Sequence, residues 1–249
     1  MQSIIEIGNI RASVTHKKIK NIHLSVNPPE GEVRISAPLH LSLDTVRVFA
    51  LSKLQWIRSE QQKFRNQERE TSREYLNRES HYLWGERYML IIAYKDAPAS
   101  VEVKHNKILL SVRSNSTKIK KQEVLESWCR EQLRHKAKGM LNVWEKKLGV
   151  QMYKLIIQKM KTKWGSCSPD THIVRLNFEL VKKPPQYLEY IIVHELMHLI
   201  EPTHNRRFTE LMNTYMPKWR EFREELNRLA LGEISEKSID TSTTFFSLR

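Results

Sequence analysis

An apolar stretch in the C-terminal half of this chain carries two histidines and a glutamate at helical spacing. Apolar residues recur at every helical turn from Tyr187 to Ile200, which predicts a buried helix. His194 and His198 stand four positions apart, so both imidazoles lie on one helix face and can bind the same metal ion. Glu195 stands beside the first histidine, where its carboxylate can accept a proton from a metal-activated water. Because unpaired buried polar groups are costly, the pattern predicts a zinc site with Glu195 as the general base.

A third histidine follows the predicted helix. His204 comes two residues after Pro202, and a proline disfavours helical geometry at the residue before it, here Glu201. The chain is therefore expected to turn at this point, which can bring His204 back toward the metal. Glu210, on the next predicted helix, is the alternative. The sequence favours His204 as the third metal ligand and leaves Glu210 open.

The composition of the whole chain indicates the cellular location of the protein. Apolar residues make up 40% of the 249 residues and charged residues 28%, and no apolar run approaches the roughly 18 residues that cross a bilayer. The first residues lack the basic start and the small-residue cleavage site of a signal peptide. Cys129 and Cys167 are the two cysteines. These features predict a reduced, cytoplasmic setting with no membrane contact.

The chain is strongly basic, with a formal net charge of +14. This charge permits phosphate-bearing or acidic partners, which include a nucleotide, a nucleic acid or an acidic polypeptide. Most surface charge only interacts with solvent, and few aromatic residues stand between the basic clusters. Contact with nucleic acid through the basic surface is therefore a weaker expectation than the metal site.

The hydrophobic pattern predicts an α+β fold. An N-terminal β-rich region with helices precedes a part in which the metal-binding helix packs on a small sheet. No internal repeat is evident in the sequence. The expected domains are 1–120, a β-rich region with one or two helices, 121–232, the catalytic part, and 233–249, a flexible tail. Ser42 and Asn205 are expected helix caps, and Pro184-Pro185 is expected to open the metal-binding helix.

Four residues outside the metal-binding helix are candidates for substrate binding. Asn177 can hydrogen-bond an extended substrate or merely close a turn. Lys163 and Arg206 can stabilise negative charge that develops on a substrate, and the alternative for each is a solvated surface cation. Trp164 is the fourth candidate, because it belongs to a Trp-Gly-Ser-Cys stretch that needs a role.

The Trp-Gly-Ser-Cys stretch has two further features of interest. Gly165 permits tight backbone geometry, which suits a turn beside the metal cleft. Cys167 is expected to be a structural thiol, although a nucleophile or a fourth metal ligand are alternatives.

Several motifs occur together in a fixed order along the chain. They are Lys18–Val26, Ile35–Pro38, Lys163–Ser168, Leu176–Leu180, Pro184-Pro185, Tyr190–Leu199, His204 with Phe208, and Met216–Trp219. This set resembles the YgjP-like metallopeptidase domain, a bacterial and archaeal family related in outline to SprT-like and minigluzincin zinc proteases. The resemblance covers nearly the whole chain and is densest from 161 to 220. Thr209 departs from it, because the family often places Trp there, and this puts the pocket wall in doubt.

The resemblance implies a zincin-like catalytic part. It implies that His194, His198 and His204 are zinc ligands and that Glu195 is the general base. The expected function is a zinc-dependent metallopeptidase that acts on polypeptides. One alternative is a metal-dependent nucleotide pyrophosphatase that uses the same site, and another is a basic, non-enzymatic, nucleic-acid-associated protein with structural zinc. Glu195 argues against the last, since a structural site has no use for a water-activating carboxylate.

Overall fold

The computed structural model describes residues 2–27, 31–66, 73–160 and 163–228. The chain divides into two compact units, one within Met1–Glu70 and the other within Thr71–Leu231. This division falls at residue 70 rather than at residue 120, and the domain boundaries expected from the sequence stay a prediction. The tail expected at 233–249 lies outside the described residues.

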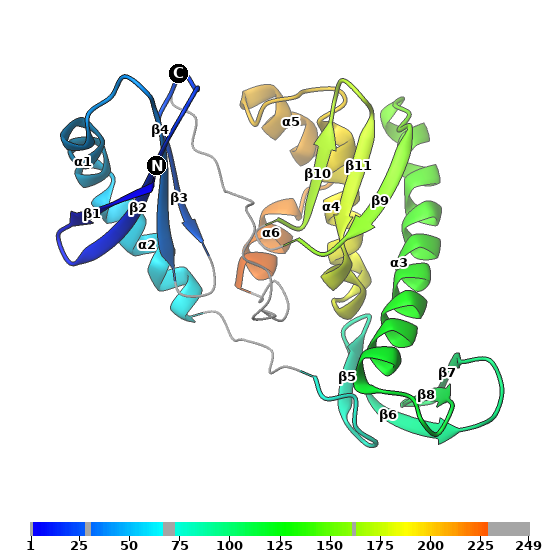
Figure 1. Ribbon diagram of the computed structural model, residues 1–249. Helices are drawn as coiled ribbons and strands as arrows, with labels where there is room; N and C mark the ends of the chain where they lie inside the picture. Colours follow the sequence, from blue (N-terminus) through cyan, green and yellow to red (C-terminus); the bar gives the residue numbers. More distant parts are fainter. Residues whose placement is uncertain (1, 28–30, 67–72, 161–162, 229–249) are drawn as a thin grey trace. The chain divides into compact units, whose positions relative to one another are not determined.

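The first unit is a four-stranded sheet followed by two helices (Figure 1). The sheet order is β1-β2-β4-β3, with a parallel pair β2–β4 in the middle and an antiparallel partner on each side. Apolar side chains of the strands pack with Val46, Ala50 and Ile57 from the helices. The elements are β1 (Gln2–Ile7), β2 (Ile10–Lys17), β3 (His23–Asn27), β4 (Glu32–Pro38), α1 (Leu43–Ser52) and α2 (Leu54–Asn66).

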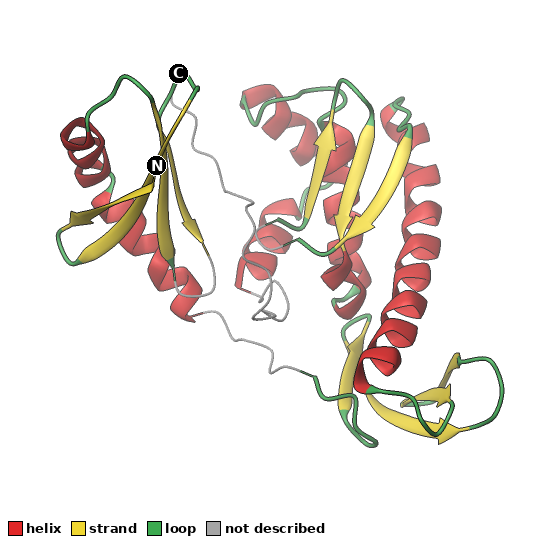
Figure 2. Cartoon of the chain, in the orientation of Figure 1, coloured by secondary structure: helices red, strands yellow, loops and turns green. Residues whose placement is uncertain are grey.

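The second unit begins with another four-stranded sheet that repeats the plan of the first (Figure 2). Its order is β5-β6-β8-β7, again with a central parallel pair, β6–β8, and antiparallel outer partners. A helix follows each sheet and begins at a hydroxyl cap. Ser42 accepts a hydrogen bond from Thr45 N, and Thr117 accepts one from Lys120 N, each at 3.2 Å. The elements are β5 (Ser80–Leu83), β6 (Glu86–Tyr94), β7 (Ser100–Lys104), β8 (Lys107–Val112) and α3 (Lys118–Leu148).

Helix α3 connects the second sheet to the part that carries the histidines. Near its start, Leu125 packs with Leu90 and Ile108 of the sheet. Further along, Leu141 and Trp144 belong to a different core, which surrounds the helix of His194 and His198. The 31 residues of α3 are therefore shared between two hydrophobic cores of the second unit.

The metal-binding helix α4 packs on a small three-stranded sheet (Figure 1). The sheet order is β10-β11-β9, so β10 forms one edge. Pro185 opens α4 as expected, since a proline at the first helical turn gives up no intrahelical hydrogen bond. The elements are β9 (Lys154–Gln158), β10 (Gly165–Ser168), β11 (Ile173–Asn177), the 3-10 turn η1 (Phe178–Lys182), α4 (Pro185–Met197), α5 (Arg206–Tyr215) and α6 (Trp219–Arg228).

The turn between β5 and β6 attaches the second sheet to the base of α4. Trp84 N donates to Val181 O at 2.8 Å, and Gly85 N donates to Lys182 O at 3.1 Å. Gly85 has φ +87°, and a Cβ there would lie 2.6 Å from Pro184 Cγ, so no other residue fits this contact.

These elements confirm the expected α+β fold, with a β-rich N-terminal region and a metal-binding helix on a small sheet. None of the helices among the described residues is both long and apolar enough to cross a membrane.

Candidate metal centre

Three histidines converge at the C-terminal end of α4. His194 lies in its last turn, His198 is the residue that caps it, and His204 lies in the loop before α5. One ring nitrogen from each lies within 4.8 Å of the other two, and Nε2 of His194 and Nε2 of His204 are 3.1 Å apart. Two ligands on a tetrahedral zinc ion lie about 3.4 Å apart when each bond is about 2.05 Å long. The arrangement of the three imidazoles therefore fits a metal ion.

The loop after α4 brings His204 into this cluster. The ring of His198 places Nδ1 3.3 Å from the carbonyl oxygen of Glu201, which leaves Nε2 free to bind a metal. Asn205 then caps α5 by accepting a hydrogen bond from Phe208 N at 3.0 Å. Glu210 is not part of the cluster, and its carboxylate accepts a hydrogen bond from Arg206 Nε at 2.7 Å.

Phe208 supports all three imidazoles from one side. Its ring centroid lies 5.2 Å from that of His194, 4.9 Å from that of His198 and 4.7 Å from that of His204. Tyr190, one turn before His194 on α4, packs edge-on against that imidazole at 5.9 Å. The aromatic contacts hold the rings in place and exclude water from part of the cluster.

The imidazoles are neutral at pH 7 in the metal-free chain. Burial, together with the neighbouring His198 and His204, lowers the pKa of His194 to about 3. Burial also lowers the pKa of His198 and of His204. A neutral imidazole is the form that binds a metal, so the three rings are ready to act as ligands.

Glu195 lies beside the cluster in a buried position. Burial raises the pKa of its carboxyl to about 8, while the positive charge of Lys163 and a hydrogen bond from the backbone N–H of Cys167 act in the opposite direction. Gly165 makes this packing possible, because a Cβ at that position would lie 2.6 Å from Oε1 of Glu195. The carboxylate is therefore held against strand β10.

The Trp-Gly-Ser-Cys stretch differs from its expected form. It was expected to be a turn, but residues 165–168 form β10, paired with β11 so that Cys167 stands opposite Val174. Gly165 is needed for close approach to α4 rather than for a turn. Cys167 is outside the metal cluster, and burial raises the pKa of its thiol to about 11, so a structural role suits it best.

Asn177 is fully buried and closes a turn, which is one of the two roles expected for it. Its Nδ2 donates to Met160 O at 2.9 Å and to Lys163 O at 2.8 Å, and its Oδ1 accepts a hydrogen bond from Glu179 N at 3.1 Å. Met160 N also donates to Oδ1 at 3.4 Å, so all four hydrogen-bonding positions of the amide are used within the chain, where they position the segment that carries Lys163.

Over residues 20–229 the sequence matches the family described as YgjP-like, metallopeptidase domain. The chain belongs to this family. Two solved structures are similar to part of it. The metallopeptidase zymogen of Pyrococcus abyssi abylysin is 21% identical with a TM-score of 0.34, and the match covers 36% of this chain and 90% of that chain. The zymogen of Methanocaldococcus jannaschii jannalysin is 27% identical with a TM-score of 0.33, and the match covers 36% and 92%. None of the curated proteins matches the chain.

Family membership confirms the resemblance seen in the sequence, and it makes this YgjP-like protein a metallohydrolase. A polypeptide is the substrate class that a metallopeptidase family implies. The histidine cluster is the candidate metal site of the domain.

The remaining predicted substrate-binding residues of this YgjP-like domain lie in different surroundings. Lys163 is exposed, and its charge acts on Glu195 and His198. Trp164 is only 8% exposed and belongs to the core around α4, so its ring is not presented to a substrate. Arg206 is exposed and paired with Glu210.

The sequence reasoning missed two residues near the site. Tyr190 was treated only as part of an apolar helix, although its position four residues before His194 predicts contact with that ring. Arg223 was not singled out, although it stands between the apolar positions Trp219, Phe222 and Leu226 on α6. Its charge acts on His194 and His204.

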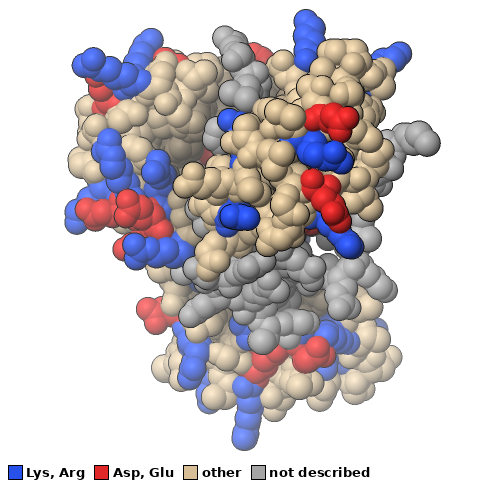
Figure 3. Space-filling view, turned by 90° about the vertical axis from the view of Figure 1, so that its left-hand side faces the viewer, with Lys and Arg blue, Asp and Glu red and all other residues tan. Residues whose placement is uncertain are grey.

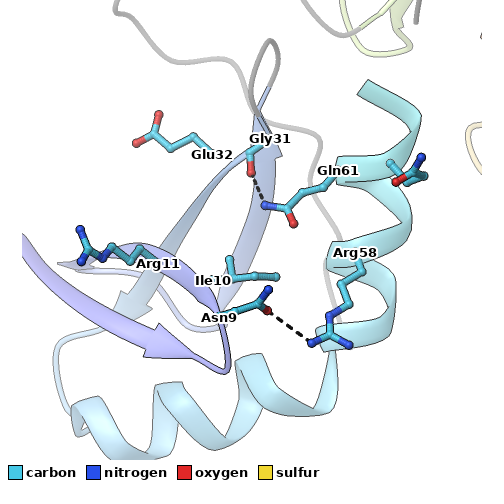
Figure 4. Close-up of a pocket in the computed structure, with 8 residues that line it drawn as sticks. Asn9, Ile10, Arg11, Gly31, Glu32, Arg58 and Gln61 are labelled. Atoms are coloured by element: carbon cyan, nitrogen blue, oxygen red, sulfur yellow. Dashed lines mark hydrogen bonds between the residues drawn. The ribbon is translucent and has the colours of Figure 1, made fainter. Parts of the chain in front are cut away.

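The N-terminal unit contains a separate pocket of about 510 Å³ (Figure 4). Arg58 of α2 donates to Oδ1 of Asn9 at 3.4 Å, and Gln61 donates to the carbonyl oxygen of Gly31 at 2.8 Å. The pocket contains none of the residues predicted for the catalytic site. On the face drawn in Figure 3, Lys and Arg side chains are interspersed with Asp and Glu, as expected of a solvated surface.

Proposed function

We propose that this protein is a zinc-dependent peptidase whose metal ligands are His194, His198 and His204 and whose general base is Glu195. The observation that carries the proposal is the convergence of three neutral imidazoles next to one buried carboxylate. Three imidazoles leave the fourth position of a tetrahedral zinc ion open, which is the arrangement of catalytic rather than structural sites.

Zinc held by these ligands would supply a Lewis acid that acidifies a water molecule and polarises a carbonyl group. Glu195 takes the proton from the attacking water and delivers it to the amine that leaves. A pKa near neutrality suits both steps, and burial raises the pKa of Glu195 toward that range. Gly165 and the N–H of Cys167 hold the carboxylate in position for this transfer.

The outer edge of β10 supports an extended polypeptide as the substrate. Among the described residues, strand β10 pairs with β11 alone, and the N–H of Cys167 donates to Glu195. The unpaired edge therefore faces the catalytic carboxylate. A peptide that adds to this edge as a further strand would bring its amide bonds beside Glu195.

Cleavage of a phosphoanhydride by the same residues is the alternative that the assay has to exclude. The net charge of +14 suits a nucleotide as well as an acidic polypeptide, so charge alone does not separate the two substrate classes. Contact with nucleic acid and a cytoplasmic location both stay predictions.

The test compares two classes of substrate under one set of conditions. Purified protein of measured zinc content is incubated with casein and with nucleoside triphosphates, each with and without a chelator. We expect chelator-sensitive cleavage of casein and no release of pyrophosphate or phosphate. The variant Glu195→Gln should keep its zinc and lose at least about a hundredfold in rate.

The matched control is Glu210→Gln, because this carboxylate lies outside the histidine cluster and pairs with Arg206. Its rate should stay within about twofold of the wild-type rate. Cleavage of nucleotides but not of casein would show that the substrate assignment is wrong. Full activity in Glu195→Gln would show that the mechanism is wrong.

A further inference from the structure

Helix α6 packs against α4 and carries an exposed arginine, Arg223, beside its buried positions. Trp219 and Leu226 are buried, and Phe222 packs against the same core. Arg223 lies four residues after Trp219 and three before Leu226, so it shares the face that these residues form. Its guanidinium carbon lies 5.4 Å from the centroid of the Trp219 ring. The stack restricts the motion of an otherwise exposed arginine.

A chain of ring contacts connects this face of α6 to the metal centre. Phe222, the neighbour of Arg223, lies 6.3 Å from Tyr190, and Tyr190 lies 5.9 Å from His194, measured between ring centroids. Arg223 follows Phe222 on α6, and this helix packs against α4. The positive charge of Arg223 contributes to the lowered pKa of His194 and of His204.

The positive charges of Arg223 and Lys163 shift the pKa values of different residues of the site. Lys163 acts on Glu195 and His198, whereas Arg223 acts on His194 and His204. Lys163 thus acts on the general base, whereas Arg223 acts on Tyr190 and on two of the histidines. Among the residues that the structure describes, no carboxylate pairs with the guanidinium of Arg223. Its positive charge can therefore interact with a ligand that is bound at the histidine cluster.

We propose that Arg223 binds the carbonyl oxygen of the scissile amide as that oxygen gains negative charge. The inference rests on the proposed peptidase function and adds the group that stabilises the oxyanion. When water attacks the carbonyl carbon, the electron pair of the C=O bond moves to oxygen, and a cation placed there in advance lowers the barrier. A guanidinium suits this role, since it stays charged at every relevant pH and offers several N–H donors in one plane.

The experiment uses full-length zinc-loaded protein and three variants, Arg223→Ala, Arg223→Lys and Arg220→Ala. The control Arg220 lies on the same helix and over the same Trp219 ring, at 4.6 Å, but donates to Asn213 Oδ1 and does not act on the histidines. The substrate is a fluorogenic peptide that reproduces a cleavage site mapped in casein. The second probe is a phosphonate analogue of that peptide, with its dissociation constant measured by calorimetry.

We expect Arg223→Ala to lower kcat by about 10²–10³-fold, with KM changed by less than about threefold and zinc content unchanged. Its affinity for the phosphonate should fall in parallel with kcat/KM, because the phosphonate oxygens resemble the oxyanion. Arg223→Lys should recover part of both losses, and Arg220→Ala should stay within about twofold of wild type.

Two outcomes would overturn the inference while leaving the peptidase intact. One is Glu195-dependent cleavage with kcat unaffected by Arg223→Ala. The other is a rise in KM alone, which would assign Arg223 to a charged group of the bound substrate. If the wild-type protein shows no Glu195-dependent cleavage of peptides, the proposed function fails and this inference fails with it.

Discussion

Gly165 of β10 lies so close to Glu195 of α4 that a Cβ atom on the glycine would stand 2.6 Å from the carboxylate oxygen Oε1. The same Cβ would stand 2.7 Å from Cγ2 of Ile191, one turn earlier on the helix. The position of the Glu195 carboxylate thus depends on the absence of a side chain on the adjacent strand. Both neighbours belong to the buried helix, so neither can move away easily.

Gly165→Ala is therefore expected to impair the enzyme without removing a functional group. The added methyl group forces the strand or Glu195 to shift, which costs about 1–3 kcal/mol of stability. We expect peptidase activity to fall at least about tenfold while the zinc content stays at one ion per chain, because the ligands are untouched. Gly139→Ala is the control, since a Cβ there meets nothing within 4 Å. It should stabilise α3 by about 0.5–1 kcal/mol and leave activity unchanged. Equal effects of the two substitutions on activity would contradict this account.

His204→Ala should weaken zinc binding, whereas Glu210→Ala should not. The imidazole of His204 belongs to the cluster, while the carboxylate of Glu210 pairs with Arg206. Loss of one ligand of three should lower the affinity by more than the 10–100-fold effect typical of residues that only orient a ligand. Competition with a chromophoric chelator measures both dissociation constants. A larger loss in Glu210→Ala than in His204→Ala would mean that the third ligand is misassigned.

Asn177→Ala should lower the free energy of unfolding. The side chain is fully buried, and its removal leaves the carbonyl oxygens of Met160 and Lys163 without their donor. Each unsatisfied buried group costs about 1–3 kcal/mol, so a loss of about 2 kcal/mol or more is expected in urea unfolding. Asn142 is exposed on α3, and Asn142→Ala should leave stability within about 0.5 kcal/mol. A neutral Asn177→Ala would show that these bonds do not hold the segment.

Stability of the metal-free protein should decline on acidification because of His194. Its pKa is about 3 in the folded chain and near 6.5 in the unfolded chain. Below about pH 6.5 the unfolded chain binds a proton that the folded chain does not, so the free energy of unfolding falls as the pH drops toward 3. Urea unfolding of chelator-treated protein at pH 7.5, 6 and 5 measures this slope. His194→Gln should make the slope shallower, and substitution of the exposed His135 by Gln should not change it.

The metal-binding helix was predictable because all of its determinants are local. Apolar residues at helical spacing, the paired prolines before it and Pro202 after it are each readable from a few neighbouring positions. The predicted helix ran from Tyr187 to Ile200, and α4 runs from Pro185 to Met197. The helix ends earlier than expected, because His198 already caps it, three residues before Glu201, where Pro202 was expected to turn the chain.

Strand β10 was not predictable in the same way. Glycine and serine have little preference for strands, and the four residues of β10 are extended because β11 pairs with them and α4 packs beside them. Both contacts come from residues distant in sequence. The position of Arg223 relative to the histidines depends in the same way on how α6 packs against α4.

The β-rich region was predicted, but the strand order that its two four-stranded sheets share was not visible in the sequence. Their shared order rests on the parallel pairs β2–β4 and β6–β8, which join strands that are not consecutive in the chain. Turns differ as well, since Gly8 and Asn9 join β1 to β2, whereas Trp84 and Gly85 join β5 to β6. The repeat is one of backbone topology, which a search for recurring residues does not find.

The presence of two similar sheets affects how the protein can evolve. The second sheet contacts the part that carries the histidines through Trp84, Gly85 and the shared helix α3. Substitutions in this sheet can therefore disturb the metal centre. The first sheet has a hydrophobic core of its own, which it forms with helices α1 and α2. Selection for catalysis therefore leaves the surface residues of the first sheet free to vary. Residues that recognise a new target can arise on that surface during evolution.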